Sequence, residues 1–199
     1  MIIPVILAST SPFRRQLLEQ AGLRFTAMAP DIDEREIEGR AEHQHVSPQE
    51  LAQVLSCEKA LAVSRQTPDG LVIGGDQVLA LGERIYHKPK DLSSARDQLL
   101  SLRGETHVLY SALALAKQGE VIWRHVSQAR MTMRMFSETF LDDYLDRAGG
   151  AILKSVGGYQ IEGLGVQLFS DIVGDYFTIV GVPLLPLMEK LRELDIVHA

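Results

Sequence analysis

Cysteine is nearly absent from this chain of 199 residues, which has only Cys57. A single thiol excludes an intrachain disulfide and a cysteine-rich zinc site, and such usage is typical of a reducing compartment. No apolar run reaches the ~20 residues that a membrane-spanning helix requires. The N-terminus also lacks the basic segment that begins a signal peptide. We therefore expect a cytoplasmic protein that has no contact with a membrane.

Positive charge is also in short supply. The chain has 20 Lys and Arg against 26 Asp and Glu, a formal net charge of -6. Proteins that bind nucleic acids nonspecifically carry the opposite excess, so we expect no nucleic-acid partner. The sequence has no P-loop, no Gly-x-Ser-x-Gly elbow and no paired-glycine dinucleotide fingerprint. Its 46% hydrophobic content predicts an ordinary globular core.

A strand, a tight turn and a helix are predicted in succession near the N-terminus. The apolar run from Ile2 to Ala8 predicts a buried strand. Ser11 and Pro12 then suit the N-cap and first position of a helix. The free N–H groups of that end, with Arg14 and Arg15 beside them, favour phosphate binding. The same pattern also occurs in ordinary strand–turn–helix units with solvated arginines, so it needs partners elsewhere in the chain.

The remaining pattern interleaves strands and helices, which predicts a mixed-sheet α/β fold. We expect helices at residues 13–21, 48–65, 92–102, 138–148 and 184–194. We expect strands at residues 25–29 and 71–81, a short return strand ending at Lys88-Pro89, and a hairpin of 106–117 with 120–135. The segment from Asp31 to Glu42 is rich in charge, and we interpret it as a mobile loop or lid.

A carboxylate interrupts the apolar run from Leu71 to Leu81. Asp76 follows two glycines there, and a buried carboxylate is costly unless it binds a metal, a cation or hydrogen-bond donors. The alternative interpretation is a turn aspartate between two strands. Lys59, Lys88 and Glu34 would each be solvated surface residues if taken alone. Together with Arg14 and Asp76 they form a coherent set, because two carboxylates can hold a divalent cation while several cations bind a triphosphate.

The ordered set of these motifs resembles the Maf family of nucleoside triphosphate pyrophosphatases. The resemblance spans nearly the whole chain, and it is the order of the motifs that makes it specific. The matching segments are Leu7 to Arg14, Ile32-Asp33-Glu34, Glu58-Lys59-Ala60, Gly75-Asp76-Gln77-Val78, Lys88-Pro89, Gly158-Tyr159-Gln160-Ile161-Glu162-Gly163 and Val180-Gly181-Val182-Pro183.

The resemblance implies a single domain over residues 1–199, with a two-lobed α/β fold related to inosine triphosphate pyrophosphatases and a central cleft. It implies hydrolysis of a nucleoside triphosphate to the monophosphate and pyrophosphate with Mg²⁺ or Mn²⁺, and a homodimer. Asp76 matches the family's proton acceptor and, with Glu34, the expected metal position. The positions that match the family's catalytic and binding residues are Ser9, Arg14, Glu34, Lys59, Asp76 and Lys88.

The family sorts its substrates partly by three positions, which are Phe13, Gln77 and Glu162 here. Gln77 and Glu162 match the branch that acts on 7-methyl-GTP, and Phe13 keeps an aromatic ring where that branch has tryptophan. Methylation makes the guanine ring cationic, so an aromatic face and a carboxylate suit it. The alternative function is a non-catalytic nucleotide-binding regulator linked to cell division. A third class, an acidic structural partner protein, predicts no stabilisation by nucleotides.

Overall fold

The computed structural model describes residues 3–43 and 45–198. The predicted first strand begins at Ile2, which lies outside the described residues. The observed strand β1 is Val5–Ala8, and all its residues are buried. Helix α1 (Pro12–Gln20) follows with Ser11 as its N-cap and Pro12 in its first turn. The predicted strand–turn–helix unit is confirmed.

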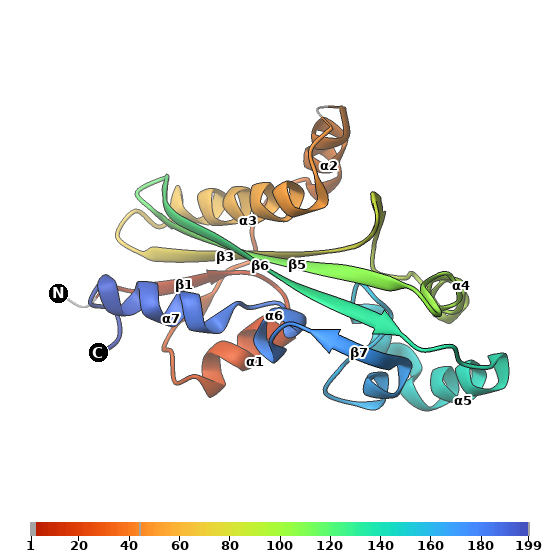
Figure 1. Cartoon of the computed structure of the whole chain (residues 1–199). Coiled ribbons are helices and arrows are strands. Elements are labelled where there is room, and N and C mark those ends of the chain that lie inside the picture. Colours follow the sequence, from red (N-terminus) through yellow and green to blue (C-terminus); the bar gives the residue numbers. More distant parts are fainter. Residues whose placement is uncertain (1–2, 44, 199) are drawn as a thin grey trace.

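Within the described residues, seven strands form one mixed sheet in the order β2-β1-β3-β5-β6-β7, with β4 paired to β3 (Figure 1). β1 is parallel to β2 and β3, whereas β3, β5, β6 and β7 each run antiparallel to the next strand in the sheet. The fold class predicted from the sequence is confirmed. The strands after β1 are β2 (Thr26–Ala27), β3 (Leu71–Leu81), β4 (Arg84–Tyr86), β5 (Thr106–Lys117), β6 (Glu120–Met133) and β7 (Phe169–Val173).

Helices cover both faces of this sheet (Figure 1). Helix α3 (Pro48–Ser64) lies on one face, opened by the predicted capping box of Ser47 and Glu50. The first helix, α1, packs on the other face with α6 and α7. The remaining α helices are α2 (Glu34–His43), α4 (Leu92–Leu102), α5 (Glu138–Ala148), α6 (Tyr176–Val180) and α7 (Leu184–Glu193), and two 3-10 turns are Gly149–Lys154 and Leu164–Leu168.

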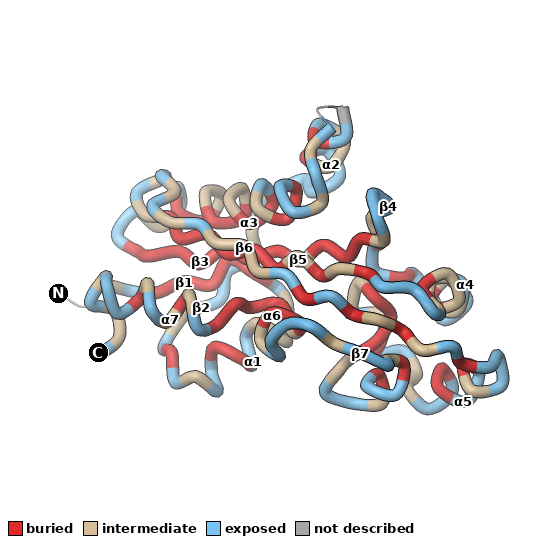
Figure 2. The backbone as a smooth tube through the Cα atoms, in the orientation of Figure 1, coloured by how far each residue is buried: buried red, intermediate tan, exposed pale blue. Residues whose placement is uncertain are grey.

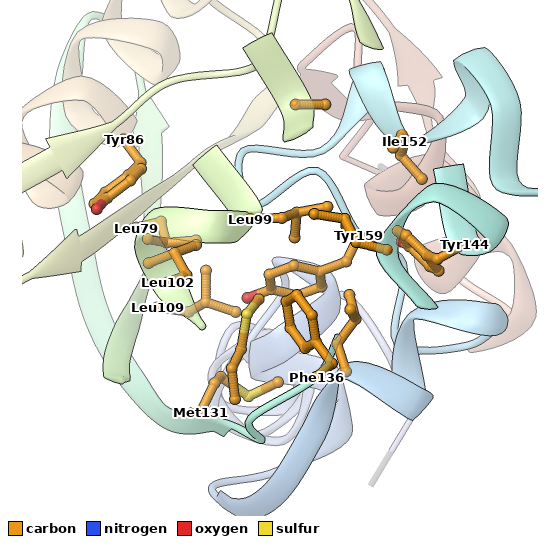
Figure 3. Close-up of a cluster of buried hydrophobic side chains, with 14 of the residues drawn as sticks. Leu79, Tyr86, Leu99, Leu102, Leu109, Met131, Phe136, Tyr144, Ile152 and Tyr159 are labelled. Atoms are coloured by element: carbon orange, nitrogen blue, oxygen red, sulfur yellow. The ribbon is translucent and has the colours of Figure 1, made fainter. Parts of the chain in front are cut away.

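Strand β3 contributes to two separate cores, which explains the two lobes. Side chains alternate between the faces of a strand, and Leu71 and Ile73 join the cluster around α1 and α7. On the same face, Leu79 joins the cluster around α4 and α5, which is drawn in Figure 3. Gly75 and Gln77 lie between them and belong to neither cluster. Figure 2 shows the buried strands running through both lobes.

The predicted acidic loop at Asp31–Glu42 is wrong, because most of this segment forms α2. Its N-terminal turn is stabilised by Asp33, whose Oδ1 accepts a hydrogen bond from the Glu36 N–H at 3.0 Å. Ile37 and Ala41 lie one helical turn apart, are buried, and pack against α3. The density of charge hides this narrow apolar stripe in the sequence. The lid movement stays a prediction.

Two strand ends also differ from the sequence prediction. The return strand β4 ends at Tyr86, before Lys88-Pro89, because proline cannot continue a hydrogen-bonded ladder. Strand β6 ends at Met133 and leaves Met135 mostly exposed. Over the described ranges, no helix combines the length and apolar character needed to cross a membrane.

Candidate active site

A cavity of about 680 Å³ opens where β3 loses one neighbouring strand. On that edge, β1 pairs only as far as Gly74 of β3, and β4 begins to pair at Leu79. Ligand sites in α/β folds favour such breaks at the ends of strands. All nine site residues predicted from the sequence line this cavity: Ser9, Phe13, Arg14, Glu34, Lys59, Asp76, Gln77, Lys88 and Glu162.

Arg14 is anchored by main-chain and hydroxyl oxygens. Its Nε donates to the Gly181 carbonyl at 3.0 Å, and its Nη1 donates to Ser9 Oγ at 3.3 Å. Ser9 Oγ also accepts from the Ser11 N–H at 3.2 Å. A side chain at Gly75 would come within 3.3 Å of Arg14, so the glycine allows this approach. Burial lowers the pKa of Arg14, opposed by Asp76 and Glu34, yet arginine stays protonated at neutral pH.

Lys59 joins the two predicted carboxylates. Its Nζ lies 2.5 Å from Asp76 Oδ1 and 2.9 Å from Glu34 Oε1. The contact depends on close packing of α3 on β3, because a Cβ at Gly74 would lie 2.2 Å from the Ser56 carbonyl oxygen. The prediction that the two glycines before Asp76 allow close approach is therefore confirmed. The turn interpretation of Asp76 is wrong, because this residue lies inside a continuous strand.

Burial and neighbouring charges change the proton affinities at this end of the cavity. Burial raises the pKa of Asp76 above its ordinary value, against the opposing influence of Lys59 and Arg14. Desolvation lowers the pKa of Lys88, and the cations of Arg14 and Lys59 lower it further. A carboxylate with a raised pKa is a better proton acceptor near neutral pH, and the surrounding cations favour a polyanion.

The described residues contain no group of three or more His, Cys, Asp or Glu side chains arranged to hold a metal ion. Asp76 and Glu34 nevertheless meet at one ammonium group. Mg²⁺ is commonly held by one or two carboxylates together with substrate phosphates. The pair therefore fits a cation that arrives with a polyphosphate, rather than one held by protein ligands alone.

Around Gln77, the polar groups that contact its side-chain amide are neutral. Gln77 Nε2 contacts Ser111 Oγ at 2.8 Å, the Thr178 carbonyl at 3.1 Å and the Ile179 carbonyl at 3.0 Å. Phe13 is half-buried and Glu162 is exposed. The sequence interpretation missed Ser111 altogether. In the sequence, Ser111 stands out only as a hydroxyl inside an apolar run. Its contact with Gln77 could not be predicted, because that contact depends on the register between β3 and β5.

Comparison with known proteins agrees with this geometry. A family model described as Maf-like protein matches residues 4–194. A 7-methyl-GTP pyrophosphatase from Rhizobium meliloti is 52% identical over 195 residues, which cover 98% of each chain. A protein of the same name from Brucella abortus is 50% identical over 192 residues, covering 96% of each. A nucleoside triphosphate pyrophosphatase from Rhodospirillum rubrum is 49% identical over 96% of this chain and 95% of its own length.

Proposed function

This chain belongs to the Maf family, and we propose that it hydrolyses a nucleoside triphosphate to a nucleoside monophosphate and pyrophosphate. The supporting observation is that a buried aspartate, a lysine and an arginine converge in one cavity. Relatives that match nearly the full chain carry the names of such enzymes.

In the proposed reaction, a water oxygen attacks the α-phosphorus of the nucleotide. The bond from that phosphorus to the bridging oxygen breaks, and pyrophosphate leaves with the electron pair. Asp76 accepts the proton of the water. Its Oδ1 is held by Lys59, which leaves Oδ2 for the water, and its raised pKa strengthens it as a base.

Positive side chains offset the charge that develops on the phosphate oxygens, which is the main source of catalysis in phosphoryl transfer. Arg14 has guanidinium hydrogens left over after its bonds to Gly181 and Ser9, and these suit two phosphate oxygens. Lys88 extends the row of cations at the rim. Asp76 and Glu34 would hold Mg²⁺ or Mn²⁺, which supplies further neutralisation of the phosphates when bound.

The test is product identification across a nucleotide panel in ¹⁸O-labelled water. We expect pyrophosphate and a nucleoside monophosphate that carries the label, because water attacks the α-phosphorus. Release of orthophosphate, or label in the pyrophosphate, contradicts the proposal. Nucleotide binding without any product would instead support the non-catalytic regulator. Dependence of the rate on added Mg²⁺ or Mn²⁺ tests the metal.

For the base, we propose 7-methyl-GTP or another modified nucleotide as the substrate. Phe13 offers an aromatic face to a cationic ring, and Glu162 offers a carboxylate at the same cavity. The measurement is kcat/KM for 7-methyl-GTP, GTP, UTP and dTTP side by side. A preference for UTP or dTTP refutes this assignment.

We further propose a cytoplasmic homodimer that binds no nucleic acid. The reduced thiol expected of Cys57 and the excess of acidic residues support the location and the lack of nucleic-acid binding. The family resemblance supports the dimer. Sedimentation equilibrium that gives the mass of one chain contradicts the dimer.

A further inference from the structure

Ser111 is a fully buried hydroxyl in the middle of β5, and the proposed chemistry does not use it. Its register partner across the sheet is Gln77 of β3. Ser111 Oγ lies 2.7 Å from the Thr178 carbonyl oxygen and 2.8 Å from Gln77 Nε2. Buried hydroxyls are normally hydrogen-bonded, and these two contacts link Ser111 to both α6 and Gln77.

The hydrogen bonds at Ser111 can be assigned in only one way. A carbonyl oxygen only accepts, so the single hydroxyl hydrogen of Ser111 must be donated to Thr178. Ser111 Oγ then accepts from the Gln77 amide, which makes the contacting Gln77 atom the nitrogen. Gln77 Nε2 also faces the carbonyl oxygens of Thr178 and Ile179. A flipped amide would place its oxygen against both carbonyls and is excluded.

This assignment leaves the other end of the amide for a ligand. Gln77 Oε1 has no hydrogen-bond partner among residues 3–43 and 45–198, and it is not sealed from solvent. Gln77 lines the cavity. Gln77 Oε1 is therefore a fixed hydrogen-bond acceptor available to a ligand in the cavity. The exposed carboxylate of Glu162 is a second acceptor at the same cavity.

The same short run of chain also fixes the phosphate end. Gly181 follows Thr178 and Ile179 at the end of α6, and its carbonyl accepts from Arg14 Nε. Gly181 has a φ of 104°, a conformation that residues with side chains rarely adopt, although a Cβ there would make only ordinary van der Waals contacts of 3.6 Å with Arg14 and 3.7 Å with Gln77 Nε2. The glycine thus lets one turn of backbone hold both side chains, so the base acceptor and the phosphate cation share one anchor.

We infer that Ser111 is a positioning residue that fixes the Gln77 amide with its oxygen toward the nucleobase. This inference rests on the proposed function. Such a site favours bases whose Watson–Crick edge presents an N–H donor, as N1 of guanine and hypoxanthine does. Adenine presents a lone pair at N1, and its N6 amine lies at a different position on that edge, so a Gln77 oxygen placed for an N1–H donor discriminates against adenine.

The experiment compares Ser111→Ala with Ser56→Ala. Ser56 is also fully buried, but its hydroxyl donates to the Gln53 carbonyl in α3. We measure kcat and KM for GTP, ITP and ATP, and inhibition by tripolyphosphate, which has no base. For Ser111→Ala we expect KM for GTP and ITP to rise about fivefold, as the loss of one hydrogen bond implies. The KM for ATP and the inhibition constant of tripolyphosphate should change little. In Ser56→Ala, the three KM values and this inhibition constant should all stay close to those of the wild type.

A readout that needs no turnover keeps the test separate from the proposed reaction. The side-chain amide of Gln77 is assigned by ¹⁵N NMR from the signal that disappears in Gln77→Met. In the wild type we expect its hydrogens to be protected from solvent exchange, and in Ser111→Ala we expect exchange to accelerate. If Ser111→Ala does not fold, the wild-type protection and the base selectivity of Gln77→Met decide.

Three outcomes overturn the inference. One is fast exchange of the Gln77 amide in the wild-type protein. Another is a loss in Ser111→Ala that is equal for nucleotides and tripolyphosphate. The third is a Ser111→Ala protein with the kinetics of Ser56→Ala. If the wild type releases no pyrophosphate from any nucleotide, the proposed function fails, while the NMR result still reports on the amide.

Discussion

Asp76 and Gln77 are consecutive residues of β3 that point to opposite faces of the sheet and still line one cavity. Asp76 faces α3 and is bound by a lysine, whereas Gln77 faces α6 and bonds only to neutral oxygens. Both reach the cavity because, on the edge of β3 opposite β5, no described strand pairs with β3 between the end of β1 and the start of β4.

The two faces differ in what holds them together. On the Asp76 face, buried charges depend on each other, and removing one leaves its partner uncompensated. On the Gln77 face, the Gln77 amide and the Ser111 hydroxyl share hydrogen bonds between neutral groups, beside the Arg14 guanidinium that Gly181 holds, and losing one of these neutral bonds costs about 1 kcal/mol. We therefore expect that chemistry and base choice can be altered separately, although the residues proposed to serve them are adjacent.

The largest effect is expected for Asp76→Asn. The amide cannot accept the proton of the water, so kcat should fall about 10³-fold, within the usual range for loss of a general base. KM should change little, since the phosphates and the base keep their other contacts. Asp69→Asn, at an exposed turn outside the cavity, is the matched control. A comparable loss of kcat in both variants would break the assignment.

The neutral face can be tested through His107, which lies on the same side of β5 as Ser111. His107 is fully buried, its Nε2 is 2.7 Å from the Tyr159 hydroxyl, and its Nδ1 has no partner within the described ranges. Burial lowers the pKa of His107 from 6.5 to about 4. Between pH 6.5 and pH 4, His107 is therefore protonated in the unfolded chain but not in the folded chain. The free energy of unfolding falls as the pH falls through this range.

The variant for this test is His107→Phe combined with Tyr159→Phe, so that no hydroxyl is left unpaired. Between pH 7 and pH 4, we expect the wild type to lose roughly 3 kcal/mol more unfolding free energy than the variant. Urea denaturation of both proteins at several pH values measures this difference. If the unfolding free energies of the two proteins change in parallel with pH, the folded protein accommodates a protonated His107. The proposed difference between the two faces would then be wrong.

The charged face is sharpened by Lys59→Met. Lys59 lowers the pKa of Asp76 by its charge and its hydrogen bond, so its removal should raise that pKa further. The acid limb of the kcat/KM profile requires ionised Asp76 and should move to higher pH, with about a tenfold loss of kcat. Lys117→Met, at the far end of the β5–β6 hairpin, is the control. An acid limb that stays in place contradicts the coupling.

The sequence alone predicted more of the charged face than of the neutral one, for a physical reason. A carboxylate in an apolar run is costly, so Asp76 was conspicuous. A serine in an apolar strand costs little, and its meeting with Gln77 depends on strand register, which composition does not encode. Helix α2 was missed because its buried stripe is narrow and includes just Ile37 and Ala41 among the positions whose burial is described. The strand–turn–helix unit at Ser11 was predictable because its signals are local.

The smallest effect is expected for Glu162→Gln at the exposed rim of the cavity. A solvated carboxylate contributes little to binding a charge, so KM for 7-methyl-GTP should rise about threefold. GTP, whose ring is neutral, should change less, and the ratio of the two kcat/KM values should fall. Glu120→Gln, at the exposed start of β6 and outside the cavity lining, is the control. If the ratio of the two kcat/KM values stays constant while both KM values rise, Glu162 contributes a hydrogen bond to the base rather than a charge interaction. The cationic ring is then recognised elsewhere, with Phe13 as the side chain to test next.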